Sequence, residues 1–300
     1  MEQATATRKL QRFRNLFLAQ LRLLHFDNAS KLKSSERLAL GLRKSNRNQS
    51  SKATQVIFLI PLVRKSQVSD WALVEMNLQK TLSSFLAQTN ENWQVIICGQ
   101  DRPNILVDPR VQFHPFENKM QGNDKWAKLE KLVDLLPNFA HSDSYVMTFD
   151  ADDLAHNDLV ETFISSQSKT GYLIDHGIVH DVSRGTYGQA GHATLKNPFR
   201  KPFWKLCGSC SAFRYCIDER EIFVKFMKEL VLHEHRMFPY LAKLSGRKLT
   251  RLTTNLICYE INHGQGFDVR LGQGNYKLRF VNRFQILDPL IIRNIKNSYG

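Results

Sequence analysis

The sequence predicts an α/β fold with a Rossmann-like, mostly parallel sheet flanked by helices, and a basic helical extension at the N-terminus. Short continuous apolar segments, of the kind buried on both faces of a parallel sheet, alternate with longer segments whose apolar residues recur at helical spacing. Positive charge is concentrated in the first 52 residues, which sets them apart from the rest. The 300 residues, 42% of them hydrophobic, are enough for a domain of this class whose core needs no disulfides.

The α/β pattern begins at Thr54. Its first half predicts strands at 55–61, 93–98, 111–116 and 145–149, and helices at 71–87 and 125–136. Its second half predicts helices at about 158–166, 218–230 and 236–244, and a strand at 172–179. Residues 183–212 have no clear period and are expected to include a substrate loop, whereas the tail, 280–300, receives no role. Strand–helix–strand alternation implies right-handed crossovers, and ligands of such sheets bind at the carboxyl ends of the strands.

Residues 1–52 are predicted to form a basic amphipathic extension and linker, and residues 53–300 the α/β domain. The extension has twelve Lys and Arg residues against three acids. Its apolar side chains recur at helical spacing at Leu10, Phe13, Phe17, Leu21 and Leu24. Such a helix can lie on an anionic membrane surface or pack on the main domain or a partner subunit, and the sequence leaves both interpretations open. The polar residues 44–54 are expected to be the linker.

The composition restricts partners and compartment. A net charge of +14 favours anionic partners: nucleotide phosphates, lipid headgroups or nucleic acid. The longest apolar segment, 56–63, contains Pro61 and is too short to span a membrane, and no early segment resembles a signal peptide. We therefore expect a cytoplasmic protein, peripheral on the inner face of the membrane if the extension binds there. The odd number of cysteines, five, favours reduced thiols; Cys207 and Cys210 have CxxC spacing, but no second ligand pair completes a zinc site.

Three carboxylates, Asp150, Asp152 and Asp153, directly follow the apolar segment 145–149. Carboxylates gathered at a strand end repel one another, and a cation would relieve that repulsion. Mn²⁺ or Mg²⁺ is expected, because such ions prefer one or two carboxylates together with phosphate oxygens, and would neutralise a departing diphosphate. The other interpretation is a solvated acidic turn that caps the following helix.

Three segments resemble the GT-A fold glycosyltransferases, in particular the family 2-like members. They are VIFLIP at 56–61, TLSSFLAQ at 81–88 followed by NWQVII at 92–97, and YVMTFDADD at 145–153. The resemblance covers about residues 54–265 and implies that 53–300 form a GT-A domain. It implies transfer of a sugar from a nucleotide-diphosphate sugar donor to a hydroxyl of a glycan or glycolipid acceptor, with inversion, in polysaccharide or glycolipid synthesis.

The resemblance also assigns roles around the metal. Asp152 would bind the metal most directly, Asp150 would contact the metal or the donor ribose, and Asp153 would support the loop. Where the family often has an acidic pair after the second strand, this chain has CGQD, so that Asp101 becomes the candidate nucleotide contact, one residue late. Lys125 falls where the family often places a donor contact, and the alternative is a solvated first-turn lysine.

A glycosyl transfer also needs a base for the acceptor hydroxyl. By resemblance Glu234, in the sequence HEH, is the expected base, with His235 as its substitute or a metal ligand; the alternative is an ordinary helix-end cluster. His263 in NHGQG is a candidate contact of diphosphate or metal, or else part of a glycine turn. The small residues of WKLCGSCS, 204–211, allow close backbone approach in the family's acceptor or donor-sugar loop, or form a plain turn.

Three other classes remain open. A haloacid dehalogenase-like phosphotransferase also has D-x-D after an apolar strand, with the first Asp as nucleophile, but there it commonly ends the first strand of the domain. A non-catalytic basic nucleic-acid-binding protein would fit the charge, although much of the excess lies in residues 1–52 and no aromatic-basic recognition motif is present. The missing acidic pair leaves room for a degenerate glycosyltransferase that acts as a scaffold.

Overall fold

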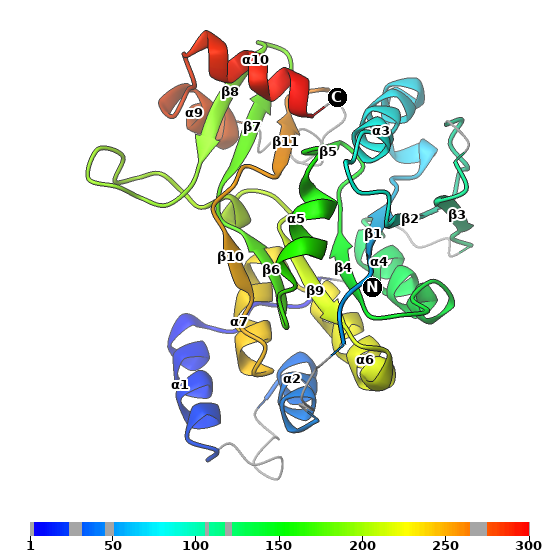
Figure 1. Ribbon diagram of the computed structural model, residues 1–300, viewed down its shortest axis with the longest axis vertical. Helices are drawn as coiled ribbons and strands as arrows, with labels where there is room; N and C mark the ends of the chain where they lie inside the picture. Colours follow the sequence, from blue (N-terminus) through cyan, green and yellow to red (C-terminus); the bar gives the residue numbers. More distant parts are fainter. Residues whose placement is uncertain are drawn as a thin grey trace.

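The computed structural model describes residues 3–23, 32–45, 51–105, 108–117, 122–264 and 275–299 (Figure 1). The strands are β1 (Gln55–Pro61), β2 (Trp93–Gly99), β3 (Val111–Pro115), β4 (Ser144–Thr148), β5 (Asp153–Ala155), β6 (Gly171–Ile174), β7 (Gly177–Asp181), β8 (Thr186–Ala190), β9 (Ser211–Tyr215), β10 (Thr250–Leu252) and β11 (Ile257–Ile261). The α-helices are α1 (Lys9–Gln20), α2 (Ser34–Lys44), α3 (Trp71–Leu86), α4 (Lys125–Leu135), α5 (Leu159–Ser166), α6 (Arg220–Val231), α7 (Phe238–Leu244), α9 (Asn275–Arg283) and α10 (Pro289–Ser298). Short 3₁₀ turns are η2 (Lys65–Gln67), η3 (Leu136–Asn138), η4 (Phe203–Lys205), η5 (Ile217–Glu219) and η6 (His235–Met237).

A seven-stranded sheet in the order β10-β6-β9-β4-β1-β2-β3 forms the centre of the molecule. β1 runs parallel to β2 and β4, whereas β9 runs antiparallel to both of its neighbours, β4 and β6. The predicted α/β class is confirmed and the arrangement is compatible with a Rossmann-like fold, but β9 makes the sheet mixed. Because β1, β2 and β4 are parallel, their carboxyl ends meet at one edge, and Asp150 follows β4 there.

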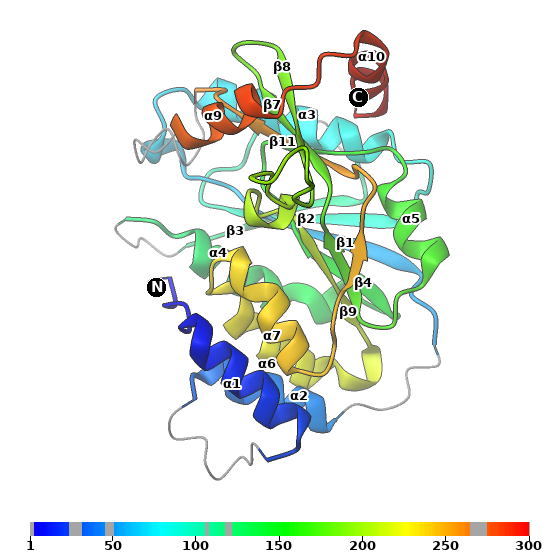
Figure 2. The same ribbon diagram turned by 90° about the vertical axis from the view of Figure 1, so that its left-hand side faces the viewer.

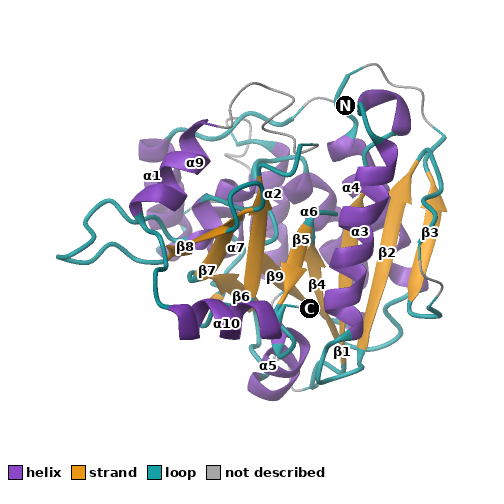
Figure 3. Cartoon of the chain, turned by 90° about the horizontal axis from the view of Figure 1, so that it is seen from above, coloured by secondary structure: helices purple, strands orange, loops and turns teal. Residues whose placement is uncertain are grey.

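The continuous apolar segment of β1 is explained by two cores, one on each face of the sheet. Ile57 and Leu59 face the core to which α4, α6 and α7 contribute. The alternate residues Val56, Phe58 and Ile60 face the second core, to which α3 and α5 contribute (Figure 3). A strand covered on both faces has no solvent side, and so the sequence of β1 shows no polar alternation.

A second, four-stranded sheet in the order β5-β11-β7-β8 lies at the upper end of the molecule, with α9 and α10 beside it (Figures 1 and 2). The expected strand at 172–179 is in fact β6 and β7, which belong to different sheets and are separated at Asp175 and His176. Residues 183–212 include β8 and the start of β9, and the tail 280–300, which has no predicted role, includes the end of α9 and all of α10.

The N-terminal helices pack against the α/β domain at its lower end (Figure 2). α2 contacts α6 and α7, and α1 contacts α7. Glu36 of α2 is fully buried, and its Oε1 accepts hydrogen bonds from the side chains of Thr7 (2.9 Å), Asn15 (3.2 Å) and Tyr240 (2.7 Å). Of the expected linker, residues 46–50 lie outside the described part, and Thr54 already donates its backbone N–H to Asp143 O.

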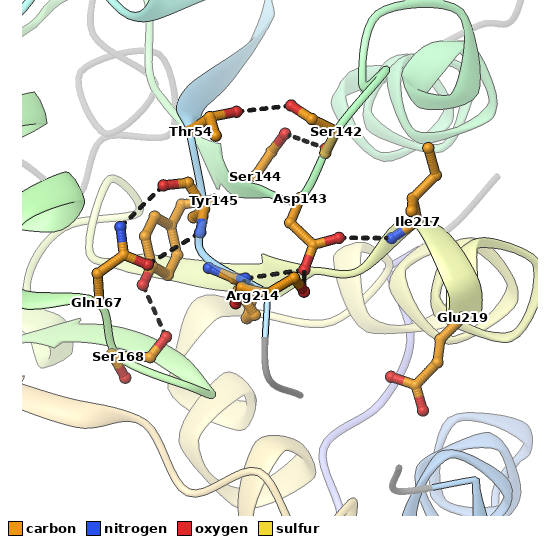
Figure 4. A network of polar contacts seen from close by, with 12 residues as sticks. Thr54, Ser142, Asp143, Ser144, Tyr145, Gln167, Ser168, Arg214, Ile217 and Glu219 are labelled. Atoms are coloured by element: carbon orange, nitrogen blue, oxygen red, sulfur yellow. Dashed lines mark hydrogen bonds and ion pairs between the residues drawn. The ribbon is translucent and has the colours of Figure 1, made fainter. Parts of the chain in front are cut away.

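Opposite the carboxyl edge, a buried ion pair ties the amino end of β4 to the carboxyl end of β9 (Figure 4). Arg214 Nη2 lies 2.8 Å from Oδ2 of Asp143 and also donates to the carbonyl of Ser51. The backbone N–H of Ile217 donates to Oδ1 of Asp143 at 3.0 Å. The carboxylate therefore joins the segment before β1, the start of β4 and the segment after β9.

Two further expectations can be compared with the structure. All five cysteines are buried and unpaired, as expected for reduced thiols. No described helix has both the length and the apolar character needed to cross a membrane.

Candidate functional site

The acidic cluster lies where two strand pairings bring distant segments together. β9 is antiparallel to β4 with Ala212 opposite Met147, so the loop before β9 must lie beside the residues that follow β4. β5 begins at Asp153 and pairs antiparallel with β11, so the residues after β11 reach the same place from another side. The cluster is therefore flanked by residues 207–209 and by His263, which sequence spacing alone could not bring together.

Asp150 is paired with Lys125, the first residue of α4. Lys125 Nζ lies 2.6 Å from Oδ1 of Asp150, and the two side chains are 30% and 25% exposed. Burial lowers the pKa of Lys125, but the neighbouring carboxylates, Asp150 first, outweigh burial and leave that pKa raised. The ammonium group therefore stays charged beside the cluster.

The loop before β9 also contacts Asp150. The backbone N–H of Asp150 donates to Ser209 Oγ at 2.8 Å. At Gly208, a Cβ atom would lie 2.9 Å from Oδ2 of Asp150, a distance at which something must shift. The small residues of 204–211 thus allow a close approach, and Asp150 is the residue approached; the loop's role toward a sugar stays a prediction.

Asp153 is fully buried, whereas the other two carboxylates are partly exposed. It accepts hydrogen bonds from Ser209 Oγ at 2.5 Å and from Cys207 Sγ at 3.1 Å. Burial and the charges of Asp150 and Asp152 raise the pKa of Asp153 well above its usual value, despite these hydrogen bonds. A buried carboxyl group whose hydrogen bonds go to the loop has the contacts of a supporting residue, not those of an exposed metal ligand.

His263 is brought to Asp152, with Nε2 2.9 Å from Oδ2. On the other side of the ring, Nδ1 lies 3.0 Å from the side-chain nitrogen of Asn77 on α3. When the neutral ring accepts an amide N–H of Asn77 at Nδ1, its proton is on Nε2, which faces Asp152. Burial lowers the pKa of His263, but Asp152 outweighs burial and leaves it raised, while the same pair lowers the pKa of Asp152 against the effect of burial. A role for His263 as a metal ligand would require this hydrogen bond to break.

Lys277 on α9 is a residue of the site that the sequence did not indicate. Burial lowers the pKa of Lys277, partly offset by nearby Cys207 and by the three carboxylates of the cluster. Its Nζ lies 4.3 Å from the centre of the Tyr259 ring. Lys277 lies just before the tail 280–300, in a segment for which the sequence predicts no element, and a single lysine has no spacing pattern, so only the packing of α9 could identify it.

The structure distinguishes the two candidate bases of the HEH segment. Glu234 is 42% exposed on its side chain and pairs with Arg236 at 3.2 Å. His235 is largely buried, and burial together with the charges of Arg236, Lys125 and Lys277 lowers its pKa to about 3. Its Nε2 is buried without a hydrogen-bond partner among the described residues. His235 is therefore the more enclosed member of the pair, with a buried ring nitrogen that no described residue contacts by a hydrogen bond.

Asp101 is not brought to the acidic cluster by any described contact; its Oδ2 accepts the backbone N–H of Lys65 at 2.8 Å. The neighbouring Gln100 instead donates to Asp124, a buried carboxylate at the start of α4. Asp124 also pairs with Lys128, whose Nζ lies 2.9 Å away. At the carboxyl end of β2, Gln100, Asp124 and Lys128 thus form a polar cluster at the place where the resembled family often has its acidic pair.

Among the described residues, no group of three or more His, Cys, Asp or Glu side chains is placed to enclose a metal ion. Asp150 and Asp152 do fit an ion that takes one or two carboxylates and completes its coordination with phosphate oxygens. Both are partly exposed, and Lys125 already places a positive charge at Asp150. These two aspartates are the residues that would hold Mg²⁺ or Mn²⁺.

In comparisons with known proteins, the chain matches no family model and no curated sequence.

Proposed function

We propose that the protein is a metal-dependent glycosyltransferase with a GT-A type fold. It transfers a sugar, with inversion, from a nucleotide-diphosphate sugar to a hydroxyl group of a glycan or glycolipid acceptor. The observation that carries the proposal is the meeting of Asp150 with Lys125, and of Asp152 with His263, at the carboxyl edge of the sheet. Open α/β sheets bind their ligands at this edge.

The lysines would bind the diphosphate of the donor. As the bond between the sugar C1 and the diphosphate oxygen breaks, negative charge grows on the leaving oxygen, and positioned ammonium groups stabilise it. Lys125 is fixed by Asp150, and Lys277 lies close enough to the cluster for the carboxylates to affect its pKa. The positive charge of Lys125 is therefore in place before a donor binds.

His235 would accept the proton of the acceptor hydroxyl while the acceptor oxygen forms its bond to C1. In the free protein its pKa is about 3, so the imidazole is neutral at pH 7 and can accept a proton, although weakly. Part of this lowering comes from Lys125 and Lys277. A diphosphate bound to these lysines would compensate their charge and raise the pKa of His235 toward the operating pH, where a general base is most effective.

The test measures hydrolysis and transfer for a panel of nucleotide-diphosphate sugars, with and without Mn²⁺. We expect Mn²⁺-dependent turnover, which Asp152→Asn and His235→Gln each lower by roughly two orders of magnitude or more. Asp218→Asn, an exposed carboxylate beyond β9, is the matched control and should behave as the wild type. Hydrolysis of a phosphomonoester without turnover of any sugar nucleotide would identify a phosphotransferase instead. If Glu234→Gln lost turnover to this extent and His235→Gln did not, Glu234 would be the base.

A further inference from the structure

Helix α1 turns its apolar side to solvent. The exposed fractions of Leu10, Phe13 and Phe17 are 87%, 73% and 55%, and those of Leu21 and Leu23 just beyond the helix are 51% and 56%. At 100° per residue, the first three side chains and Leu21 share one face, which we call the α1 stripe. Large side chains gathered in this way on the surface are typical of an interaction site.

The side of α1 that faces the protein contacts it through Asn15 and Ala19, and partly buried Leu16 packs against the core. Asn15 and Ala19 are the buried residues of α1. The side chain of Asn15 donates to Oε1 of Glu36 at 3.2 Å and to the Tyr240 hydroxyl at 3.1 Å. The orientation of the helix is therefore fixed by a buried hydrogen-bond network, and rolling the α1 stripe inward would leave Glu36 with fewer donors.

The charge around the α1 stripe indicates what covers it. Residues 3–23 contain five Lys and Arg residues and no acid, and Lys9 and Arg14 are exposed on the two sides of the stripe. A second copy would bring the same basic surface face to face with itself, in a chain whose net charge is +14. Nucleic acid would use the basic side chains but not a row of leucine and phenylalanine. An anionic lipid surface uses both, because apolar side chains enter the acyl boundary while Lys and Arg contact the headgroups.

We infer that α1 is a docking helix that binds the protein peripherally to an anionic membrane surface through the α1 stripe. The inference does not depend on the proposed glycosyl transfer, because it rests on the exposure, orientation and charge of α1. The segment before the helix also connects it to the candidate site: the backbone N–H of Ala4 donates to Leu232 O at 2.8 Å, three residues before His235. Docking through α1 would therefore hold the segment around Leu232 and His235 near the lipid surface.

The experiment is co-sedimentation of the full chain with phosphatidylcholine vesicles that either contain or lack phosphatidylglycerol. We expect binding to the anionic vesicles alone, which weakens as salt rises because the charge attraction is screened over about 8 Å at physiological salt. F13S/F17S should weaken binding roughly tenfold or more through the lost apolar contact. Lys9→Gln combined with Arg14→Gln should weaken it by about tenfold or more through lost charge.

Leu195→Ser is the matched control, because Leu195 is also fully exposed but lies in the loop after β8. It should bind vesicles as the wild type does. The inference fails if F13S/F17S binds like the wild type, or if neutral vesicles bind the wild type as well as anionic ones. It also fails if ultracentrifugation shows a wild-type dimer that F13S/F17S dissociates, which would assign the α1 stripe to a second copy. Donor hydrolysis, measured in parallel without lipid, should be equal in the wild type and in F13S/F17S, so that loss of docking and loss of activity are distinguishable.

Discussion

Gly208 shows at the scale of one residue how narrowly the acidic cluster is enclosed. Gly208→Ala would place a methyl group 2.9 Å from Oδ2 of Asp150, so that the carboxylate or the loop must move. We expect turnover of the nucleotide sugar to fall by about 100-fold, the scale of a misplacement near 1 Å. Steady-state kinetics checks this, with Gly41→Ala as control, because the added Cβ there has only an ordinary contact, 3.7 Å from Ile222. Unchanged kcat/KM in Gly208→Ala would show that Asp150 is not positioned by this loop.

The sequence indicated some members of the candidate site and not others, for physical reasons. Asp150 and Asp152 follow a buried strand, a pattern that the parallel-sheet rule alone places at a ligand edge. Lys125 and His263 were named as candidates, and the structure brings both to the cluster. Lys277 carries no local pattern, and its place depends on how α9 packs on the second sheet. Their roles in catalysis stay predictions.

At the scale of elements, the Asp143–Arg214 ion pair lies at the end of the β4–β9 ladder where β4 begins and β9 ends. Burial raises the pKa of Asp143, but hydrogen bonds from Ser51 and Ile217 and the Arg214 guanidinium outweigh burial and lower it. A carboxylate with a lowered pKa stabilises the folded state above its unfolded pKa of about 3.9, and this stabilisation is lost as the pH falls through the folded pKa.

Asp143→Asn should therefore cost about 3 kcal/mol at neutral pH, because the buried Arg214 loses its counter-charge. The difference in unfolding free energy between wild type and variant should narrow as the pH falls below about 4. Urea unfolding at several pH values measures it. A difference that is constant across this range would mean that the charge of Asp143 contributes nothing.

Elements with a strong local pattern agree closely with the prediction, and those set by packing do not. The expected helix at 71–87 and strand at 93–98 match α3 and β2 to within a residue. The segment 172–179 is apolar enough for one strand, but Asp175 is buried beside Arg251 at the point where the chain passes from one sheet to the other. The two strands pair with different distant strands, β6 with β10 and β7 with β11, and Asp175 pairs with Arg251, 76 residues further along the chain. No local pattern in 172–179 contains this information.

At the scale of the whole molecule, the N-terminal segment has two sides with different consequences for stability. Leu42 of α2 is fully buried, whereas Leu10 of α1 is 87% exposed. We expect Leu42→Ala to lower the unfolding free energy by about 3 kcal/mol, and Leu10→Ala to change it by less than about 0.5 kcal/mol. Chemical denaturation compares the same substitution at both positions. Equal effects would show that α2 is not part of the cooperative unit.

The pairing that assembles the site also sets an order of events during synthesis. The acidic cluster leaves the ribosome with β4, before the loop at 207–209, His263 and Lys277 exist, because translation runs from the N-terminus. A nascent chain that ends before β9 has three neighbouring carboxylates, and only Lys125 of the compensating groups described above has been made. Charge compensation therefore arrives stepwise from the later half of the chain, and the complete cluster of contacts can form only near the end of translation.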